Sequence, residues 1–414
     1  MKVKNIQLGK PTITWKEALF SEVFKILRNN SLSRAELSEN NGNVKNIHYG
    51  DVLIKFNECI HADKEENIPY IANTDIAYKL LKSSPLKNGD VVFADAAEDN
   101  TVGKCSEIIM HKDMNLVAGL HTIPCRPVFK FAEGYLGYYL NSSLFHNQLL
   151  QYIQGSKISS ISKKSLNQTI IRYPEVEIYQ QKIASYFEAL DSQIQVTTKR
   201  LESLKQIKAS SLQSMFPQEG ETTPKVRFKG FDGEWEKDIL GNLFKERVEN
   251  NVNGELLSVT INNGIIKASE NGRFDNSNKD KSHYKAVKHD DIVYNTMRMW
   301  QGASGHSKYE GIVSPAYTVI IPQNKVFSLF FSYLFKTASI INKFKINSQG
   351  LTTDTWNLKY FALSSIEVLF PKNKLEQQQI ASYFINLDKQ ITLQSQRLEK
   401  LKQIKAACLD KMFV

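Results

Sequence analysis

The chain has 414 residues, which is enough for two or three domains of ordinary size. Apolar residues make up 42% of it and charged residues 23%, a balance that excludes a disordered tail, a fibrous repeat and a small disulfide-stabilised protein. Lysine and arginine (53) outnumber aspartate and glutamate (43), so the formal net charge of +10 is compatible with a polyanionic partner without proving one.

The cysteines and the apolar stretches bear on cellular location. The four cysteines form no C-x-x-C pair, so neither a zinc knuckle nor a redox motif is indicated, and we expect a reducing, cytoplasmic setting. The first residues lead into polar sequence, which does not suggest a signal peptide. The longest apolar stretch, Val326–Phe335, is far short of the ~20 residues of a membrane span, so we expect no membrane partner.

Residues 1–173 form the first predicted globular part. Short β-type runs at Asp51–Phe56 and Asp90–Phe93 are broken by Gly, Asn and Asp, and a helical stretch follows at Tyr135–Ile153. This mixture predicts a compact α+β domain with a small sheet, mostly antiparallel or mixed.

A long helix is predicted next, over residues 174–216. Its apolar residues are spaced alternately by four and three positions, which is the heptad pattern of a coiled coil. One polar residue, Thr197, interrupts the pattern and either fixes the register of a pair or faces solvent. The positions of this seam are Ile183, Phe187, Leu190, Ile194, Thr197, Leu201 and Leu204.

Residues 217–234 are rich in Pro, Gly and charge and are interpreted as a linker to a second globular part at 235–370. This part has a β-type run at Tyr317–Ile321 and a helical stretch at Phe327–Phe344. Three of its segments resemble segments of the first part, and the third alignment places His121 and Tyr317 at matching positions. The pairs are Trp15–Phe24 with Trp235–Phe244, Lys87–Phe93 with Lys288–Tyr294, and Val117–Thr122 with Val313–Thr318.

The last segment, 371–414, repeats the first long helix. Residues 174–216 align with residues 371–413 without a gap, at a constant offset of 197, and 24 of these 43 positions are identical. The repeat preserves the heptad seam, including its single polar position. The seam positions here are Ile380, Phe384, Leu387, Ile391, Gln394, Leu398 and Leu401.

The motifs of self-contained enzymes are missing. No Gly-x-Gly and no P-loop occurs, and the eight histidines show neither H-x-x-x-H nor H-E-x-x-H spacing. There is no Pro-Pro dipeptide, so the loop that holds the target amine in amino-methyltransferases is not present. We therefore predict no catalytic residues, no metal site and no bound cofactor in this chain.

The repeated helix openings carry a resemblance to a known family. They read Gln180–Phe187 followed by Leu190–Asp191, and Gln377–Phe384 followed by Leu387–Asp388, each after an aromatic-Pro pair. Further signals are Phe228–Trp235, Asp290–Tyr294, Val313–Tyr317 and Gln349-Gly350. With two divergent domains between the helices, the chain resembles the specificity (S) subunit of type I restriction–modification systems.

That resemblance implies a fold and a role. The fold would be α+β, with two target-recognition domains separated by two helices packed as an antiparallel coiled coil, in a pseudo-twofold internal repeat. Each domain would read one half of a bipartite, asymmetric site in double-stranded DNA. Two modification (adenine methyltransferase) subunits would dock on the chain, and restriction or motor subunits would join through them. S-adenosylmethionine, ATP and Mg would then belong to those partners.

The helix length agrees with a spacer role. A helix of about 40 residues is ~60 Å long, and one turn of DNA is ~34–36 Å. An antiparallel pair of that length could hold two domains about one turn apart.

Candidate DNA-binding residues follow from the resemblance and from side-chain chemistry, because arginine, asparagine and glutamine suit base edges and lysine suits phosphates. The alternative for each is a packed or merely solvated side chain. In the second domain the candidates are Arg298, Trp300, Gln301, Lys308 and Tyr317. In the first they are Asn100, Thr101, Lys104, His121, Lys157, Lys163 and Lys164.

Two other functions compete with this interpretation. The first is a stand-alone bivalent DNA-binding repressor, for which like halves and a palindromic site would be expected. The second is a scaffold with no nucleic-acid role, which would show no salt-dependent affinity for DNA. The divergence of the two globular parts favours an asymmetric site.

Overall fold

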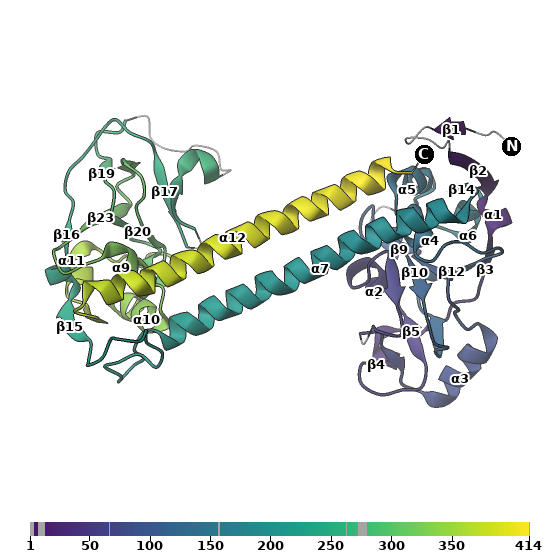
Figure 1. Cartoon of the computed structure of the whole chain (residues 1–414), viewed down its shortest axis with the longest axis horizontal. Coiled ribbons are helices and arrows are strands. Elements are labelled where there is room, and N and C mark those ends of the chain that lie inside the picture. Colours follow the sequence, from purple (N-terminus) through teal and green to yellow (C-terminus); the bar gives the residue numbers. More distant parts are fainter. Residues whose placement is uncertain are drawn as a thin grey trace. The chain divides into compact units, whose positions relative to one another are not determined.

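The computed structural model describes most of the chain, namely residues 4–6, 13–65, 67–155, 158–261, 263–271 and 280–413. It divides into two compact units, Met1–Thr197 with Arg397–Val414 and Thr198–Gln396. Each unit therefore combines one globular domain with about half of each of two long helices, α7 (Glu177–Ser214) and α12 (Lys374–Lys411) (Figure 1).

The first domain is built on a five-stranded mixed sheet. Its strand order is β3-β12-β8-β10-β6, and only the β10–β6 pair is parallel. The bounds are β3 Phe24–Ile26, β6 Cys59–His61, β8 Val91–Ala94, β10 Cys105–Ile109 and β12 Thr122–Pro127.

Smaller sheets and short helices surround this sheet. A four-stranded sheet has the order β11-β5-β7-β4, a three-stranded one β1-β2-β14, and β13 pairs with β9. The strands are β1 Lys4–Ile6, β2 Ile13–Leu19, β4 Leu37–Ser38, β5 Lys45–Ile47, β7 Tyr70–Ile71, β9 Ala96–Ala97, β11 Leu116–Ala118, β13 Ser159–Ser160 and β14 Ile170–Pro174. The helices are α1 Phe20–Val23, η1 Arg34–Glu36, α2 Tyr49–Ile54, α3 Thr74–Ser83, α4 Tyr135–Leu140, α5 Ser143–Leu150 and α6 Lys163–Asn167.

The second domain has a four-stranded sheet, β16-β23-β20-β21, whose neighbours are all antiparallel. Three further antiparallel pairs are β15–β24, β17–β18 and β19–β22. The strands are β15 Glu236–Ile239, β16 Phe244–Glu246, β17 Leu257–Thr260, β18 Gly264–Lys267, β19 Lys285–Val287, β20 Ile292–Asn295, β21 Ser304–His306, β22 Gly311–Val313, β23 Tyr317–Pro322 and β24 Glu367–Phe370. The helices are α8 Leu240–Leu243, η2 Ala268–Asn271, η3 Met299–Gln301, α9 Ser328–Leu334, α10 Ala338–Asn347 and α11 Tyr360–Ser364.

The two domains share a four-strand framework. The order β3-β12-β8-β10 of the first domain corresponds to β16-β23-β20-β21 of the second. Just ahead of the central strand, a buried aspartate accepts a backbone N–H and a bidentate arginine in both domains. The pairs are Asp90 with Arg126 and Asp291 with Arg247. The α+β class and the internal repeat are thereby confirmed.

One predicted β-type run is wrong. Residues 51–54 of this run lie in helix α2, which begins at Tyr49 and is capped by the His48 side chain accepting from the Gly50 N–H, and Lys55 and Phe56 follow its end. The run is too short to show a period, and Ile54 faces solvent where an alternating strand pattern would have buried it. The runs at Asp90–Phe93 and Tyr317–Ile321 are strands β8 and β23, as predicted.

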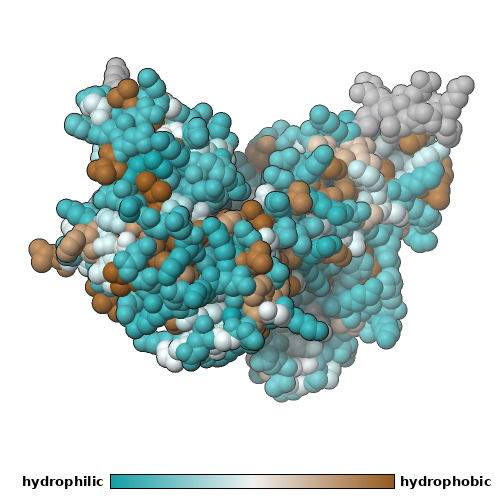
Figure 2. Space-filling model, turned by 60° about the vertical axis from the view of Figure 1, so that its left-hand side comes forward, coloured by the Kyte–Doolittle hydropathy of each residue, from teal (hydrophilic) through white to brown (hydrophobic). Residues whose placement is uncertain are grey.

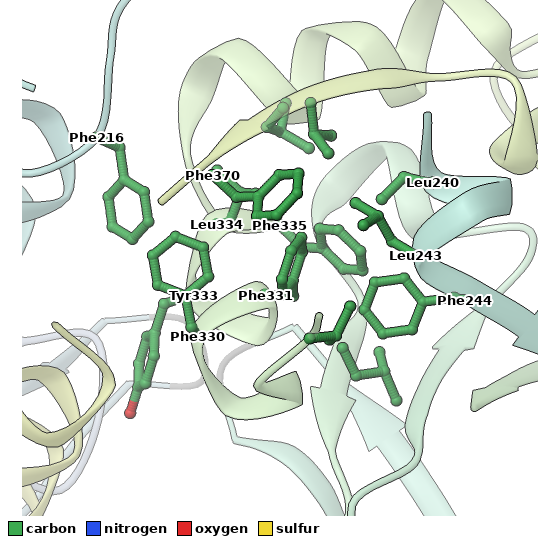
Figure 3. Packing of buried hydrophobic residues seen from close by; sticks show 14 of the residues in the cluster. Phe216, Leu240, Leu243, Phe244, Phe330, Phe331, Tyr333, Leu334, Phe335 and Phe370 are labelled. Atoms are coloured by element: carbon green, nitrogen blue, oxygen red, sulfur yellow. The ribbon is translucent and has the colours of Figure 1, made fainter. Parts of the chain in front are cut away.

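Each domain has an aromatic core. In the second, phenylalanines from α8–β16, α9 and β24 pack together, with Phe330, Phe331 and Phe244 fully buried. Figure 3 shows Tyr333 at the margin of this cluster, with its hydroxyl oxygen pointing away from the apolar side chains. The first domain repeats the arrangement, with Tyr138 at the position of Tyr333.

In the first unit, the two long helices pack antiparallel against the domain. Tyr186 of α7 contacts Cys408 of α12, and Asp191 contacts Lys405, so rising numbers in one helix meet falling numbers in the other. The Lys405 ammonium lies 2.6 Å from Asp191 and 2.5 Å from Glu58 of the domain. The Tyr138 hydroxyl donates to Asp191 at 2.8 Å and completes a polar latch between domain and helices.

The second unit repeats this latch with residues 197 positions away in the helices. Lys208 of α7 lies 2.5 Å from Asp388 of α12, and the Tyr333 hydroxyl donates to Asp388 at 2.8 Å. Ser211 contacts the Tyr383 hydroxyl at 2.9 Å, which again makes the helix halves antiparallel. In the first unit Phe187 stacks on Phe413, and here Phe384 stacks on Phe216.

The predicted seam lies along the inner face of the helices. Its fully or nearly buried members are Phe187, Leu201, Leu204, Ile380, Phe384 and Leu387. The half-buried ones are Ile183, Leu190, Ile194, Ile391, Leu398 and Leu401. The polar position is buried at Thr197 and half-buried at Gln394, which does not fit a slot that faces solvent.

The surface is mostly hydrophilic on the face drawn in Figure 2, where apolar residues are scattered in small groups. None of the helices in the described part of the chain combines the length and the apolar composition that crossing a bilayer requires.

Candidate nucleic-acid interface

Three segments meet at one end of the central sheet in the first domain. They are the reading loop after β8 (residues 95–103), the turn before β12 (119–121), and a Gln-Gly hairpin that begins at Gln154-Gly155 and returns through residues 158–160. The Asp95 N–H donates to the His121 carbonyl at 3.0 Å, and the Ile161 N–H donates to the Asp95 carbonyl at 2.9 Å. Gln154 and Ser160 close the hairpin through two backbone hydrogen bonds of 3.1 and 2.8 Å.

The second domain brings the same three segments together. Its reading loop covers residues 296–302, its turn residues 314–316 and its Gln-Gly hairpin residues 349–357. The Thr296 N–H donates to the Ala316 carbonyl at 3.2 Å, and the Leu358 N–H donates to the Thr296 carbonyl at 2.9 Å. Gln349 and Asn357 close the hairpin with bonds of 3.0 and 2.8 Å. Each domain thus presents three adjoining loops on a common framework.

The strand register corrects one predicted equivalence. Ala94 pairs with Thr122 in the first domain, and Asn295 at the corresponding position pairs with Tyr317 in the second. Tyr317 therefore corresponds to Thr122, and His121 corresponds to Ala316. Tyr317 begins strand β23 and is half-buried against an apolar cluster, whereas His121 lies in the turn before β12 with a φ of 54° and is exposed.

Both reading loops are fixed at one point. Val102 in the first and Met299 in the second are completely buried in the domain cores. Each loop ends on a glycine with positive φ, 88° at Gly103 and 82° at Gly302, a conformation that other residues rarely adopt. The exposed residues are 98–101 in the first loop and Met297 and Arg298 in the second.

The second reading loop exposes a cation and packs its aromatic residue. Arg298 is exposed, and within the described residues its guanidinium has no hydrogen-bond or ion-pair partner. Trp300 donates its indole N–H to the Met297 carbonyl at 3.0 Å and contacts Trp356 edge-on, so it supports the loop. Gln301 is half-buried, and Lys308 is exposed just past β21.

The first reading loop has the opposite character. Asn100 and Thr101 are exposed beside Glu98 and Asp99, and the Thr101 hydroxyl donates to the Asp99 carboxylate at 2.5 Å. The tip is therefore acidic. Asp and Glu are acceptors suited to the exocyclic amine of cytosine rather than to phosphates.

Cations beside this loop come from other segments. His121 Nδ1 lies 3.2 Å from Asp95, and its ring contacts Tyr49 edge-on. Lys163 and Lys164 open helix α6 and are exposed. Burial raises the pKa of the Asp95 carboxyl, which His121 and Lys163 oppose by favouring its charged form. Lys157 lies outside the described residues.

Lys104 does not fit the predicted phosphate contact. Its ammonium donates to the Leu53 and Phe56 carbonyls at 3.0 and 2.9 Å, at the end of helix α2. Burial lowers the pKa of this amine. Lys104 thus fastens the end of the reading loop to the domain, a role that sequence alone does not distinguish from an exposed lysine.

A second buried lysine, Lys336, was not among the predicted residues. Its ammonium donates to the carbonyls of Ser304 at 2.9 Å, Ile261 at 3.1 Å and Gly302. Burial and the neighbouring Lys208 lower the pKa of this amine to about 8. Lys336 holds the end of the second reading loop against the β17–β18 hairpin. The Gln-Gly hairpin of the first domain was also missed, although Gln154-Gly155 and Gln349-Gly350 are the same dipeptide.

In the ranges that the structure describes, His, Cys, Asp and Glu side chains nowhere gather in a group of three that could hold a metal ion. The interface has the character of a recognition surface, with exposed polar side chains on anchored loops.

Comparisons with solved structures agree with this architecture. The chain is similar to the crystal structure of a type I restriction–modification S subunit from M. genitalium, with 14% identity, a TM-score of 0.59, and coverage of 99% of this chain and 98% of that one. It is also similar to a structure titled for complex assembly and conformational transition of the type I R-M system, with 14% identity, a TM-score of 0.50 and coverage of 96% and 97%. At such identities the likeness is one of fold. A comparison with curated protein sequences found no match.

The family comparison covers both halves of the chain. A model described as the type I restriction modification DNA specificity domain matches residues 12–206 and again residues 234–403. Each match takes in one globular domain and most of the long helix that follows it. Because these two matches account for most of the sequence, the chain belongs to the family of type I restriction modification DNA specificity domains.

Proposed function

We propose that this chain is the specificity subunit of a type I restriction–modification complex and reads a bipartite, asymmetric site in double-stranded DNA, one half with each domain. The observation that carries the proposal is the repeated three-loop surface. Its framework is the same in both domains, while its exposed residues differ, with Glu98, Asp99 and Asn100 in the first and Arg298 in the second. Different side chains on one framework read different bases.

The DNA-binding residues of this proposal are the exposed ones. Arg298 suits a bidentate contact to guanine, and Asn100 suits adenine. Lys163, Lys164 and Lys308 suit phosphates, which position the domain without reading sequence. Thr101, His121 and Gln301 border the same surfaces, and Trp300 and Tyr317 support them from below.

The helices serve in this proposal as a spacer and as a docking surface for two modification subunits. Apolar side chains are exposed at matching positions of the two helices, Val196 and Leu393 at 63% each, and Ile178 and Leu375 at 48% and 63%. Two copies of one partner require two like surfaces, and these pairs supply them. S-adenosylmethionine, ATP and Mg belong to the partners, and restriction subunits join through the modification subunits.

The deciding experiment is a domain exchange. Residues 235–370 are replaced by the matching domain of another family member, and the methylated sites of cells carrying the full system are mapped. One half of the recognised sequence should change while the other half and the spacing stay. A change in both halves, or in neither, would show that the domains are not independent readers.

The division of labour has its own test. The purified chain without partners should transfer no methyl group to DNA. Val196→Asp together with Leu393→Asp should weaken co-purification with the methyltransferase subunit while leaving the melting temperature of the chain unchanged. Methyl transfer by the isolated chain would contradict the proposal.

A further inference from the structure

Leu351 is the most exposed large hydrophobic residue in the described part of the chain, with 101% of its reference area open to solvent. It stands two residues after Gln349 in the Gln-Gly hairpin of the second domain. A single exposed leucine is ordinary on a protein surface, so the way in which this one is held decides whether it has a role.

The hairpin holds Leu351 outward. Gly350 has a φ of 150°, and a Cβ at that position would lie 2.6 Å from the Thr355 carbonyl oxygen, so only glycine fits. The Thr352 N–H donates to the Thr355 hydroxyl at 3.1 Å, and that hydroxyl donates back to the Thr352 carbonyl at 2.9 Å. The turn is thus held by hydrogen bonds between its own residues, and Leu351 stays exposed to solvent.

The base of the hairpin is fastened to the reading loop. Trp356 contacts Trp300 at a ring distance of 5.2 Å, and the Leu358 N–H donates to the Thr296 carbonyl at 2.9 Å. Lys345 lies 5.8 Å from the Trp356 ring and adds a cation at the base of the hairpin. The leucine thus stands on a hairpin joined to the loop that carries Arg298, which the proposed function assigns to DNA.

The first domain carries a related feature. Its Gln-Gly hairpin also begins with a glycine of positive φ, Gly155 at 108°, whose added Cβ would collide with the Ile158 carbonyl. Ile158 in this hairpin is 61% exposed. An exposed aliphatic side chain on a glycine-dependent hairpin beside the reading loop therefore occurs in both domains.

We propose that Leu351 is a wedge that enters the duplex at the second half-site and unstacks one base step. The inference rests on the proposed function and adds DNA distortion to base reading. Apolar wedges on DNA-binding proteins unstack steps in this way, at a cost of a few kcal/mol that the wider protein–DNA contact offsets. Burial of the leucine between bases contributes to that offset.

The test uses duplexes carrying 2-aminopurine, whose fluorescence rises on unstacking, at successive positions through the half-site found by methylation mapping. With the full-length chain, one position should brighten. Leu351→Ala should abolish that rise and weaken binding roughly tenfold, and Leu351→Phe should restore it. The matched control is Leu19→Ala, because that exposed leucine ends strand β2 of the first domain, outside the three-loop surfaces and the docking surface, and should leave the signal unchanged.

A duplex with a mismatch at the responsive step distinguishes unstacking by Leu351 from an ordinary surface contact. A mismatch at the responsive step removes the unstacking cost, so it should recover most of the affinity that Leu351→Ala loses. Specific binding with no fluorescence change at any position would overturn the wedge and leave the proposed function standing. Loss of methyltransferase assembly in Leu351→Ala with an unchanged DNA signal would assign the leucine to a protein contact instead. Failure of the wild-type chain to prefer the mapped site would overturn both proposals.

Discussion

At one pair of equivalent positions, the two domains use different side chains to bind the backbone of the strand that follows the reading loop. Asn141 in the first domain donates to the Cys105 carbonyl at 2.8 Å and accepts from its N–H at 3.1 Å, which ties a helix end to the strand after the reading loop. Lys336 takes that position in the second domain and reaches the Ser304 carbonyl with a longer, charged side chain.

The longer side chain has a structural reason. The second domain has a β17–β18 hairpin beside β21, and Lys336 also donates to Ile261 in that hairpin at 3.1 Å. The first domain instead pairs β10 with the parallel strand β6 and needs no such reach. Both domains therefore hold the strand after the reading loop at the same carbonyl, while the element that packs beside that strand differs between them.

The largest expected effect tests the shared framework. Asp90→Ala and Asp291→Ala should each lower the unfolding free energy of their domain by about 3–5 kcal/mol, because each strands a partly buried guanidinium and frees a backbone N–H. Urea unfolding followed by domain-specific probes measures both losses. Glu367→Ala, which removes an exposed ion pair with Lys237, is the control and should cost under about 1 kcal/mol. Unequal losses in the two domains would break the claim of a common framework.

The sequence predicted the repeated parts well because their signals are local. A heptad seam recurring with 24 identities identifies two helices of equal design, and turn residues on either side delimit strands such as β8 and β23. The same locality explains the failures. The run Asp51–Phe56 was too short to distinguish a strand from a helix. The alignment of His121 with Tyr317 was wrong by one residue, because a one-residue insertion between two divergent domains cannot be located from a single sequence.

The DNA-binding role of the candidate residues stays a prediction, and the structure adds which of their side chains are exposed and which are occupied. The segments containing Arg298 and Asn100 do lie on exposed loops, since both follow the end of a central strand. The sequence could not show that Lys104 is occupied by two carbonyls or that Trp300 supports the loop. Whether a polar side chain is free depends on distant backbone groups, which no local pattern reports.

The pH dependence of stability should have opposite signs in the two domains. Glu107 and His306 occupy equivalent positions, opposite Val91 and Ile292. Burial raises the pKa of Glu107 to about 7, so the folded first domain keeps a proton that the unfolded chain has lost. Its stability should fall by about 3 kcal/mol as the pH rises from about 4.5 to 7.

His306 should act in the reverse direction. Burial lowers the pKa of its imidazole despite the nearby Asp290, so below its ordinary pKa the unfolded chain binds the extra proton. The stability of the second domain should therefore rise as the pH increases toward about 6.5. Unfolding measured between pH 4.5 and 8 tests both slopes. Glu107→Gln should remove the first slope only, and slopes of equal sign in the wild type would contradict the assignment.

The polar latches should differ in strength between the units. Lys405 holds two carboxylates, Glu58 and Asp191, in a setting only 12–20% exposed, so Lys405→Met should cost about 2–3 kcal/mol by leaving two like charges unpaired. Lys208 holds Asp388 alone in a more exposed setting, so Lys208→Met should cost about 1 kcal/mol. Thermal unfolding of the two variants measures the difference. A larger loss for Lys208→Met would reverse this ranking.

Substitutions on the DNA-binding surface should distinguish base reading from phosphate binding in the second domain. Arg298→Ala should cost about 1–3 kcal/mol of binding free energy if the guanidinium makes a bidentate base contact, and it should relax one position of one half-site. Lys308→Ala should weaken binding to every sequence alike and reduce the dependence of log K on log salt by about 1. Competition binding against a library of single-base variants, at several salt concentrations, distinguishes the two outcomes. Because Asn100 is uncharged and neutralises no phosphate, Asn100→Ala should relax the other half-site with no change in salt dependence. A uniform loss for Arg298→Ala, with the ordering of sequences intact, would mean that this arginine positions the domain and that the bases are read elsewhere.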